Sequence, residues 1–181
     1  MLAALVVLGI QVHVAAVDGT PVADEAFLAR QLAFANQQFA ALDVEWRIVG
    51  RDALPASAAR VEDAAERSSF GPLVKGTVVH VFVTGQLDDI DKPGEVIRGV
   101  TWRTGETKYV ILSAQAPDRV LAHELGHVFG LPHSTYAISI MNKTPRDQPP
   151  PEERRFADEE LAVMKQSLAR LLKTKVLTAR P

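Results

Sequence analysis

Alternating apolar and polar residues open the chain. Between Ile10 and Ala16 the apolar positions alternate with Gln11 and His13, which is the two-residue period of a strand with one buried face. No charged residue precedes Asp18, whereas a signal peptide begins with a basic segment. The pattern predicts a strand over 2–17, and it does not favour a signal peptide or a membrane span.

A helical period follows this strand. Two acidic residues at 24 and 25 precede apolar residues spaced by three or four, which predicts an amphipathic helix over 23–42; the apolar residues are Leu28, Leu32, Ala35, Phe39 and Leu42. A second alternation around Trp46 predicts another strand. The near-continuous β-branched run over 77–83 predicts a strand buried on both faces.

The remaining segments are shorter or less regular. Alanine-rich residues over 56–69 predict a short surface helix, and 86–95 predict an exposed acidic loop. Short strands are expected at 100–103 and 108–113, followed by a helix over 118–129. Four prolines within 145–151 indicate a stiff connector. A final amphipathic helix is expected after Asp158.

The segment from His123 to His133 carries the chemistry, and it has the sequence H-E-L-G-H-V-F-G-L-P-H. On a helix, His123 and His127 lie one turn apart on the same face and can bind one metal ion. Glu124 then flanks the ion and is placed to accept a proton from water. Gly130 can end the helix, so that the chain turns and brings His133 back as a third ligand.

This spacing is highly specific. With ordinary residue usage, the two histidines, the glutamate, the glycine and the third histidine coincide in roughly 1 in 10⁵ chains of this size. Three protein ligands also leave a fourth position open, as catalytic zinc requires. One enzymatic alternative replaces His133 with a distant acidic ligand, for which the candidates are Glu152, Glu153, Glu159 and Glu160.

The motif resembles the zinc signature of the metzincin metallopeptidases, in which a methionine turn follows the third histidine. Met141 lies eight residues beyond His133, and the spacing is most similar to the matrixin branch. The resemblance implies an α/β (α+β) fold with a mixed, twisted, five-stranded sheet and two long helices, one carrying the zinc motif. An upper subdomain over 1–133 would precede a small lower subdomain over 134–181 with a C-terminal helix.

The same resemblance implies a function. It predicts a zinc metalloendopeptidase that uses Glu124 as general base, with Met141 as an apolar floor beneath the metal and Gly130 as structural support. The strand over 99–103 would be the edge of the cleft and would hold a peptide or protein substrate. The cleft residues expected on this analogy are Gly99, Val100, Thr101, Trp102, Asn142 and Lys143.

Composition narrows the remaining choices. The net charge of −2 and the pI near 6.2 give no general attraction to nucleic acid. There is no cysteine, so a thiol cannot hold the zinc site latent, which departs from the common matrixin pattern. His13 and His80 are dispersed in the sequence, and we expect them to be structural. Asp88, Asp89 and Asp91 suit calcium, but they form no complete calcium loop.

Two further expectations remain open at this stage. The chain can instead be a zinc-binding regulatory or interaction module without general proteolysis, although such a module needs no proton acceptor beside the metal. The family resemblance favours a secreted or periplasmic monomer, although no clear signal peptide is present.

Overall fold

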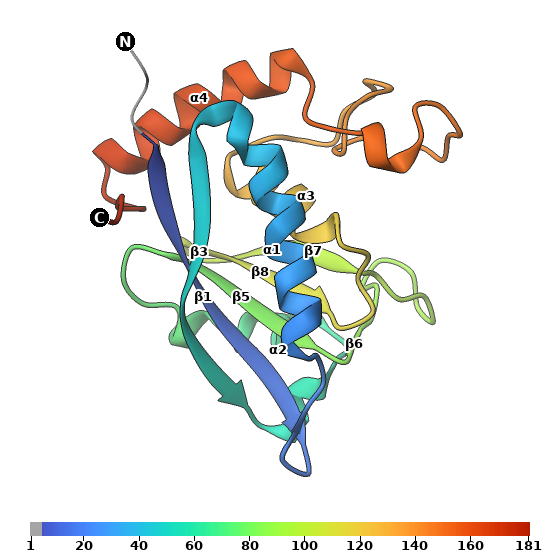
Figure 1. Ribbon diagram of the computed structural model, residues 1–181. Helices are drawn as coiled ribbons and strands as arrows, with labels where there is room; N and C mark the ends of the chain where they lie inside the picture. The colour runs from blue at the N-terminus through green and yellow to red at the C-terminus, as the bar shows by residue number, and fades with distance from the viewer. Residues whose placement is uncertain (1–4) are drawn as a thin grey trace.

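A mixed, twisted sheet organises the computed structural model, which describes residues 5–181 (Figure 1). Its five long strands lie in the order β3-β1-β5-β8-β7, and the two-residue β2 (Thr20–Pro21) pairs with β1. The first four are parallel to one another, and β7 is antiparallel to β8. The strands are β1 (Val6–Val17), β3 (Val44–Leu54), β5 (Val79–Thr84), β7 (Gly99–Thr104) and β8 (Thr107–Ser113). This confirms the predicted fold class; residues 2–4 of the first predicted strand lie outside the described residues.

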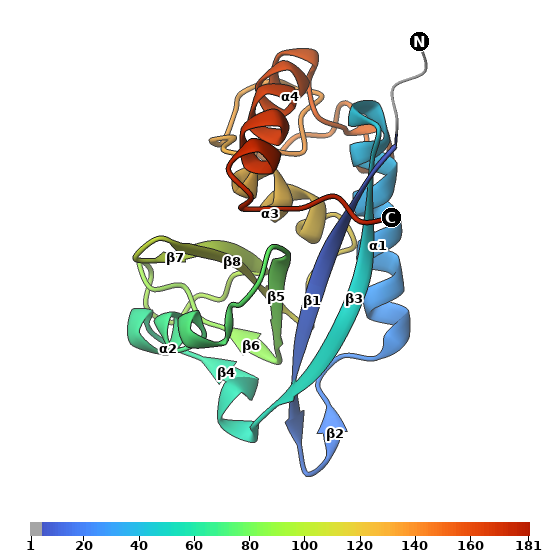
Figure 2. The same ribbon diagram turned by 90° about the vertical axis from the view of Figure 1, so that its left-hand side faces the viewer.

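Helices cover one face of this sheet. α1 (Glu25–Phe39) continues into a 3-10 turn (Ala40–Leu42) and packs with α3 (Val120–Val128) against the sheet. α4 (Asp158–Lys173) lies beyond α3, at the end of the molecule where β1 begins (Figures 1 and 2). None of the helices in the described residues is long and apolar enough to cross a bilayer.

The buried strands contribute to both faces of the sheet. On β5, Val81 and Val83 join the hydrophobic cluster under α1 and α3, while Phe82 between them joins a second cluster. On β8, Leu112 and Ile111 divide in the same way. This alternation is the pleat of a strand buried on both faces, and it explains why these runs read as continuously apolar.

Smaller elements complete the second face. α2 (Ala64–Ser68), β4 (Arg60–Val61) and β6 (Gln86–Leu87) surround the second cluster (Figure 2). The single helix predicted over 56–69 is therefore wrong, because a 3-10 turn (Ala56–Ala59) and β4 precede the five-residue α2. Asp63 at its N-cap accepts a hydrogen bond from the Glu66 amide, which starts α2 late in this segment.

Gln31 fixes the position of α3 relative to α1. Its side chain is buried and donates from Nε2 to the carbonyls of Ala116 and Pro117, while its Oε1 accepts from the Leu121 amide. These bonds satisfy backbone groups just before and inside the first turn of α3. The helix that carries the zinc motif is thus held to the sheet at its start, although it is shorter than the predicted 118–129.

Candidate metal centre and peptide cleft

Helix α3 ends where the third histidine requires it to end. Gly130 has φ +89°, its amide donates to the His127 carbonyl, and the Leu131 amide donates to the Gly126 carbonyl. This is the paired hydrogen-bond pattern of a glycine C-cap. A side chain at position 130 would be strained in this left-handed conformation. The turn redirects the chain so that His133 faces the two histidines of the helix.

The three histidines converge through their Nε2 atoms. His127 Nε2 lies 3.2 Å from His123 Nε2 and 3.2 Å from His133 Nε2. The Nδ1 atom of His123 is 2.8 Å from the Ile140 carbonyl oxygen, and that of His127 is 2.7 Å from the Leu131 carbonyl oxygen. Because a carbonyl only accepts, these Nδ1 atoms carry the protons and leave the Nε2 lone pairs of His123 and His127 available.

These residues fit a zinc ion. Two ligands of a tetrahedral site with bonds of roughly 2.0–2.1 Å lie about 3.3–3.4 Å apart, close to the observed Nε2 separations. Two unprotonated nitrogens cannot hydrogen-bond to each other, whereas a shared cation would make their close approach favourable. Burial lowers the pKa of His123 to about 4 and also lowers the pKa values of His127 and His133. Neutral imidazoles are the form that binds metal.

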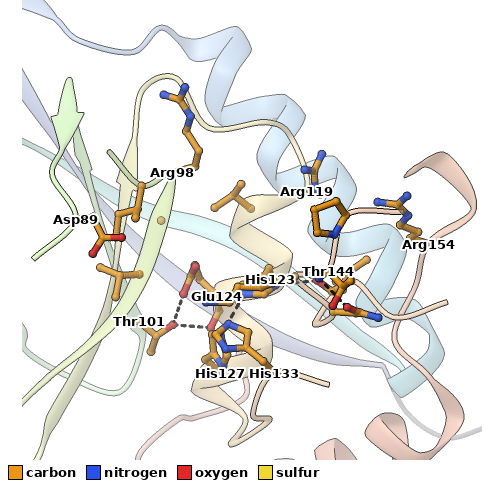
Figure 3. Close-up of a pocket in the computed structure, with 18 of the residues that line it drawn as sticks. Asp89, Arg98, Thr101, Arg119, His123, Glu124, His127, His133, Thr144 and Arg154 are labelled. Carbon is orange, nitrogen blue, oxygen red and sulfur yellow. Dashed lines mark hydrogen bonds between the residues drawn. The ribbon is translucent and has the colours of Figure 1, made fainter. Parts of the chain in front are cut away.

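Glu124 lies beside this centre with its side chain buried. Its carboxylate accepts a hydrogen bond of 2.9 Å from the Thr101 hydroxyl, which also lies 2.8 Å from the Glu124 carbonyl oxygen (Figure 3). Burial raises the pKa of Glu124 to about 7, against the opposing effect of the Thr101 hydrogen bonds. A carboxyl group with this pKa can both accept and release a proton near neutral pH.

Met141 packs directly beneath the helix. It is fully buried, and a Cβ atom added at Gly126 would lie 2.7 Å from its sulfur, so the glycine permits the close approach. The Met141 amide donates to Ser139 Oγ, which in turn donates to the buried Glu160 carboxylate. Glu160 also accepts from the Ala157 amide at the start of α4. The methionine turn is therefore anchored to the last helix.

A cleft of about 860 Å³ opens over the histidines. Five of the six residues predicted for it line its walls: Gly99, Val100, Thr101, Asn142 and Lys143. Trp102 does not; its side chain donates to Ser68 Oγ and stacks on Arg67. Sequence reasoning missed five basic lining residues, because they are far apart in the chain: Arg67, Arg98, Lys108, Arg119 and Arg154.

The other candidate ligands do not join this centre. Within residues 5–181 the one group of three or more possible metal ligands is His123, His127 and His133. The Glu160 carboxylate accepts hydrogen bonds from Ser139 Oγ instead, which argues against Glu160 as a distant third ligand of the metal. The acidic loop also forms no such group, and its Asp88 pairs with Arg60.

His13 and His80 require a correction, because they are not isolated from each other. Their side chains meet inside the sheet, with His13 Nε2 2.9 Å from His80 Nδ1. His13 Nδ1 lies 3.3 Å from Asp52 Oδ2, and His80 Nε2 faces the backbone of Lys75. The sequence could not show this pair, because the pair depends on the register between β1 and β5. In that register Gln11 lies opposite His80, and His13, two residues further along β1, lies opposite Phe82.

Comparison with known proteins gives the family. A family model described as matrixin matches residues 74–166, slightly more than half of the chain, including every residue of the histidine centre. The chain belongs to the matrixin family. This confirms the resemblance inferred from the zinc motif, and the family implies zinc as the metal of the centre. No curated protein sequence matches this matrixin.

Solved structures resemble the matrixin in fold. Archaemetzincin from Methanopyrus kandleri aligns with a TM-score of 0.57 at 17% identity, over 90% of this chain and 96% of its own. Metalloproteinase-II from Bacteroides fragilis aligns with a TM-score of 0.58 at 12% identity, over 92% of this chain and 55% of its own. Mature mirolysin from Tannerella forsythia aligns with a TM-score of 0.56 at 14% identity, over 72% of this chain and 65% of its own. At these identities the likeness shows a metzincin-like metallopeptidase fold and no finer property.

Proposed function

We propose that this matrixin is a zinc-dependent endopeptidase in which Glu124 acts as general base. The observation that carries the proposal is the convergence of three Nε2 atoms beside a buried carboxyl group. The three histidines and Glu124 line a cleft that is large enough to hold several residues of a peptide. His123, His127 and His133 would hold the zinc ion.

The chain's own residues divide the chemistry among them. When bound, zinc supplies Lewis-acid chemistry, since it polarises a carbonyl group and lowers the pKa of water. Glu124 accepts the proton of the attacking water and passes it to the nitrogen that leaves as the peptide bond breaks. The Thr101 hydroxyl holds the Glu124 carboxylate within the cleft during both transfers.

The edge of the sheet supports an extended substrate. Among the strands described, β7 pairs only with β8, and its residues Gly99, Val100 and Thr101 line the cleft. An unpaired strand edge can hold an extended peptide through main-chain hydrogen bonds. Because such bonds do not require a chain end, this geometry favours cleavage within a chain.

The test compares the parent with Glu124→Gln on a mixed peptide library, with zinc counted in both. Removing a general base lowers the rate by roughly 10²–10⁴-fold, so we expect cleavage by the parent alone and equal zinc content. Glu106→Gln, on the exposed β7–β8 turn outside the cleft, serves as the matched control and should retain activity. Zinc in both proteins with cleavage in neither would contradict the proposal and favour a zinc-binding module.

A further inference from the structure

Seven basic side chains but only three acidic ones line the cleft. Arg119, Lys143, Arg146 and Arg154 all line it, and we call these four residues the basic wall. Asp89, Arg98 and Thr101 lie on the other side of the histidine centre from Arg119 and Arg154 (Figure 3). The whole chain has a net charge of −2, so this concentration does not reflect an overall basic composition.

The basic wall is not neutralised within the protein. None of the seven ion pairs formed by residues 5–181 includes one of its four cations. By contrast, the negative charges of Asp89 and Asp91, which line the cleft elsewhere, act on the buried guanidinium of Arg67. Within the described residues, the positive charge of the basic wall therefore faces the cleft without an ion-pair partner.

Two of the four cations hold the wall in place. Arg146 donates to the carbonyls of Ala137, Ser139, Asn142 and Thr144. Arg154 donates to the carbonyls of Pro149 and Arg146. These bonds order the segment after Met141, and carbonyl partners leave both guanidinium charges uncompensated. Arg154 Nη2 lies 2.7 Å from the Arg146 carbonyl oxygen, and burial and then the charges of Arg154 and Arg119 lower the pKa of Arg146.

The other two cations are exposed and can contact a ligand. Lys143 lies two residues after Met141, and Arg119 lies four residues before His123 at the start of α3. Lys143 lines the same cleft as His133, and after burial its charge is the next cause of the lowered pKa of His133. Lys143 and Arg119 both line the cleft that contains the three histidines.

We propose that the basic wall is a subsite for a carboxylate of the peptide substrate, next to the bond that is cleaved. This rests on the proposed peptidase function and names the substrate class: peptides with an aspartate or glutamate side chain, or a C-terminal carboxylate, at that position. Arginine and lysine bind carboxylates through charge-assisted hydrogen bonds. Such a bond inside the cleft is worth roughly a 10- to 100-fold preference over a neutral analogue.

The experiment uses matched peptides and the zinc-loaded protein. One series carries glutamate or glutamine at each position from three residues before to three residues after the cleaved bond, with an amidated C-terminus. A second series carries glutamine throughout and ends in either a free carboxylate or an amide. If the subsite binds a side chain, kcat/KM in the first series should favour glutamate over glutamine roughly 10- to 100-fold at one position. If it binds a chain end, kcat/KM in the second series should favour the free carboxylate over the amide by a similar factor.

Variants locate the preference. Lys143→Gln and Arg119→Gln should each reduce the ratio of acid to amide kcat/KM, and both residues are exposed, so we expect the fold and zinc content to persist. Lys143→Glu should reduce the ratio of acid to amide kcat/KM further than Lys143→Gln does. Arg98→Gln removes a cation from the other side of the histidine centre and should leave the ratio unchanged. An equal effect of Arg98→Gln would overturn a localised subsite.

Failure of the subsite and failure of the peptidase function give different results. If the protein cleaves peptides but acid and amide peptides react equally at every position, the subsite is wrong and the peptidase function stands. If no peptide is cleaved, the binding affinities of the same acid and amide peptides for the protein test the subsite. Tighter binding of the acid that Lys143→Gln abolishes supports the subsite, and equal binding overturns it.

Discussion

The Thr101 hydroxyl on β7 lies 2.9 Å from a carboxylate oxygen of Glu124 on α3. This contact joins the edge strand of the sheet to the helix that carries the histidines. Val120 and Glu124 also pack against Gly99 of the same strand, where an added Cβ would lie 2.5 Å from Val120 and 3.2 Å from Glu124. Strand and helix are thus fitted closely at the point where a peptide would lie.

We predict that Thr101→Val, which keeps the side-chain shape and removes the hydroxyl, lowers kcat by roughly 10-fold, equivalent to about 1.4 kcal/mol of barrier. The change leaves Glu124 without its hydrogen-bond partner, so the base is less well placed in the transition state. KM and zinc content should change little. Thr101→Ser restores the hydroxyl and should recover most of kcat; equal losses in both variants would point to a packing defect.

His133 should be required for zinc binding. His133→Ala removes one of three ligands, so we expect zinc affinity to fall by more than the roughly 10- to 100-fold typical of losing a supporting partner. Metal content after dialysis at fixed free zinc measures this. Glu160→Gln is the matched comparison, and it should retain zinc because Glu160 bonds to Ser139 and Ala157. Loss of zinc from Glu160→Gln alone would support the distant acidic ligand.

The buried Glu160 should stabilise the fold. Glu160→Ala leaves Ser139 Oγ and the Ala157 amide without their partner, and we expect the free energy of unfolding in urea to fall by about 2–4 kcal/mol. Glu159→Ala changes the exposed neighbouring carboxylate and should cost less than about 1 kcal/mol. Similar losses in the two variants would show that the helix terminus, and not the Ser139 network, is responsible.

Stability should decrease in mild acid because of His13. Burial, and then the charge of His80, lower its pKa, while Asp52 raises it. The unfolded state therefore takes up a proton before the folded state does as the pH falls. The stability is complete above the unfolded pKa of about 6.5 and decreases below it. Urea unfolding between pH 8 and 5 should show a steeper decline for the parent than for His13→Asn, and parallel curves would contradict this.

The sequence predicted the features that depend on local spacing. His123, Glu124 and His127 share one helix, and Gly130 ends it, so their arrangement follows from helix geometry alone. The alternation over β1 and the apolar run of β5 also predicted strands correctly, because burial on one or both faces leaves a period in the sequence. The division into subdomains at residue 133 stays a prediction.

The features that the sequence could not reveal depend on tertiary contacts. Arg119 and Arg154 are 35 positions apart in the chain, and only the tertiary fold brings them to one cleft. The hydrogen bond from Thr101 to Glu124 requires the exact placement of β7, and the pairing of His13 with His80 requires a strand register. None of these relationships has a local pattern that periodicity or spacing could detect.

If this matrixin is a zinc peptidase, one zinc ion held by three histidines should be sufficient for peptide cleavage. The most direct measurement is peptide cleavage by metal-stripped protein as zinc is added back in known amounts. We predict no cleavage without zinc and a rise that reaches its plateau at one zinc per chain. Cleavage that persists without metal, or one bound zinc per chain with no cleavage of any peptide, would contradict the account.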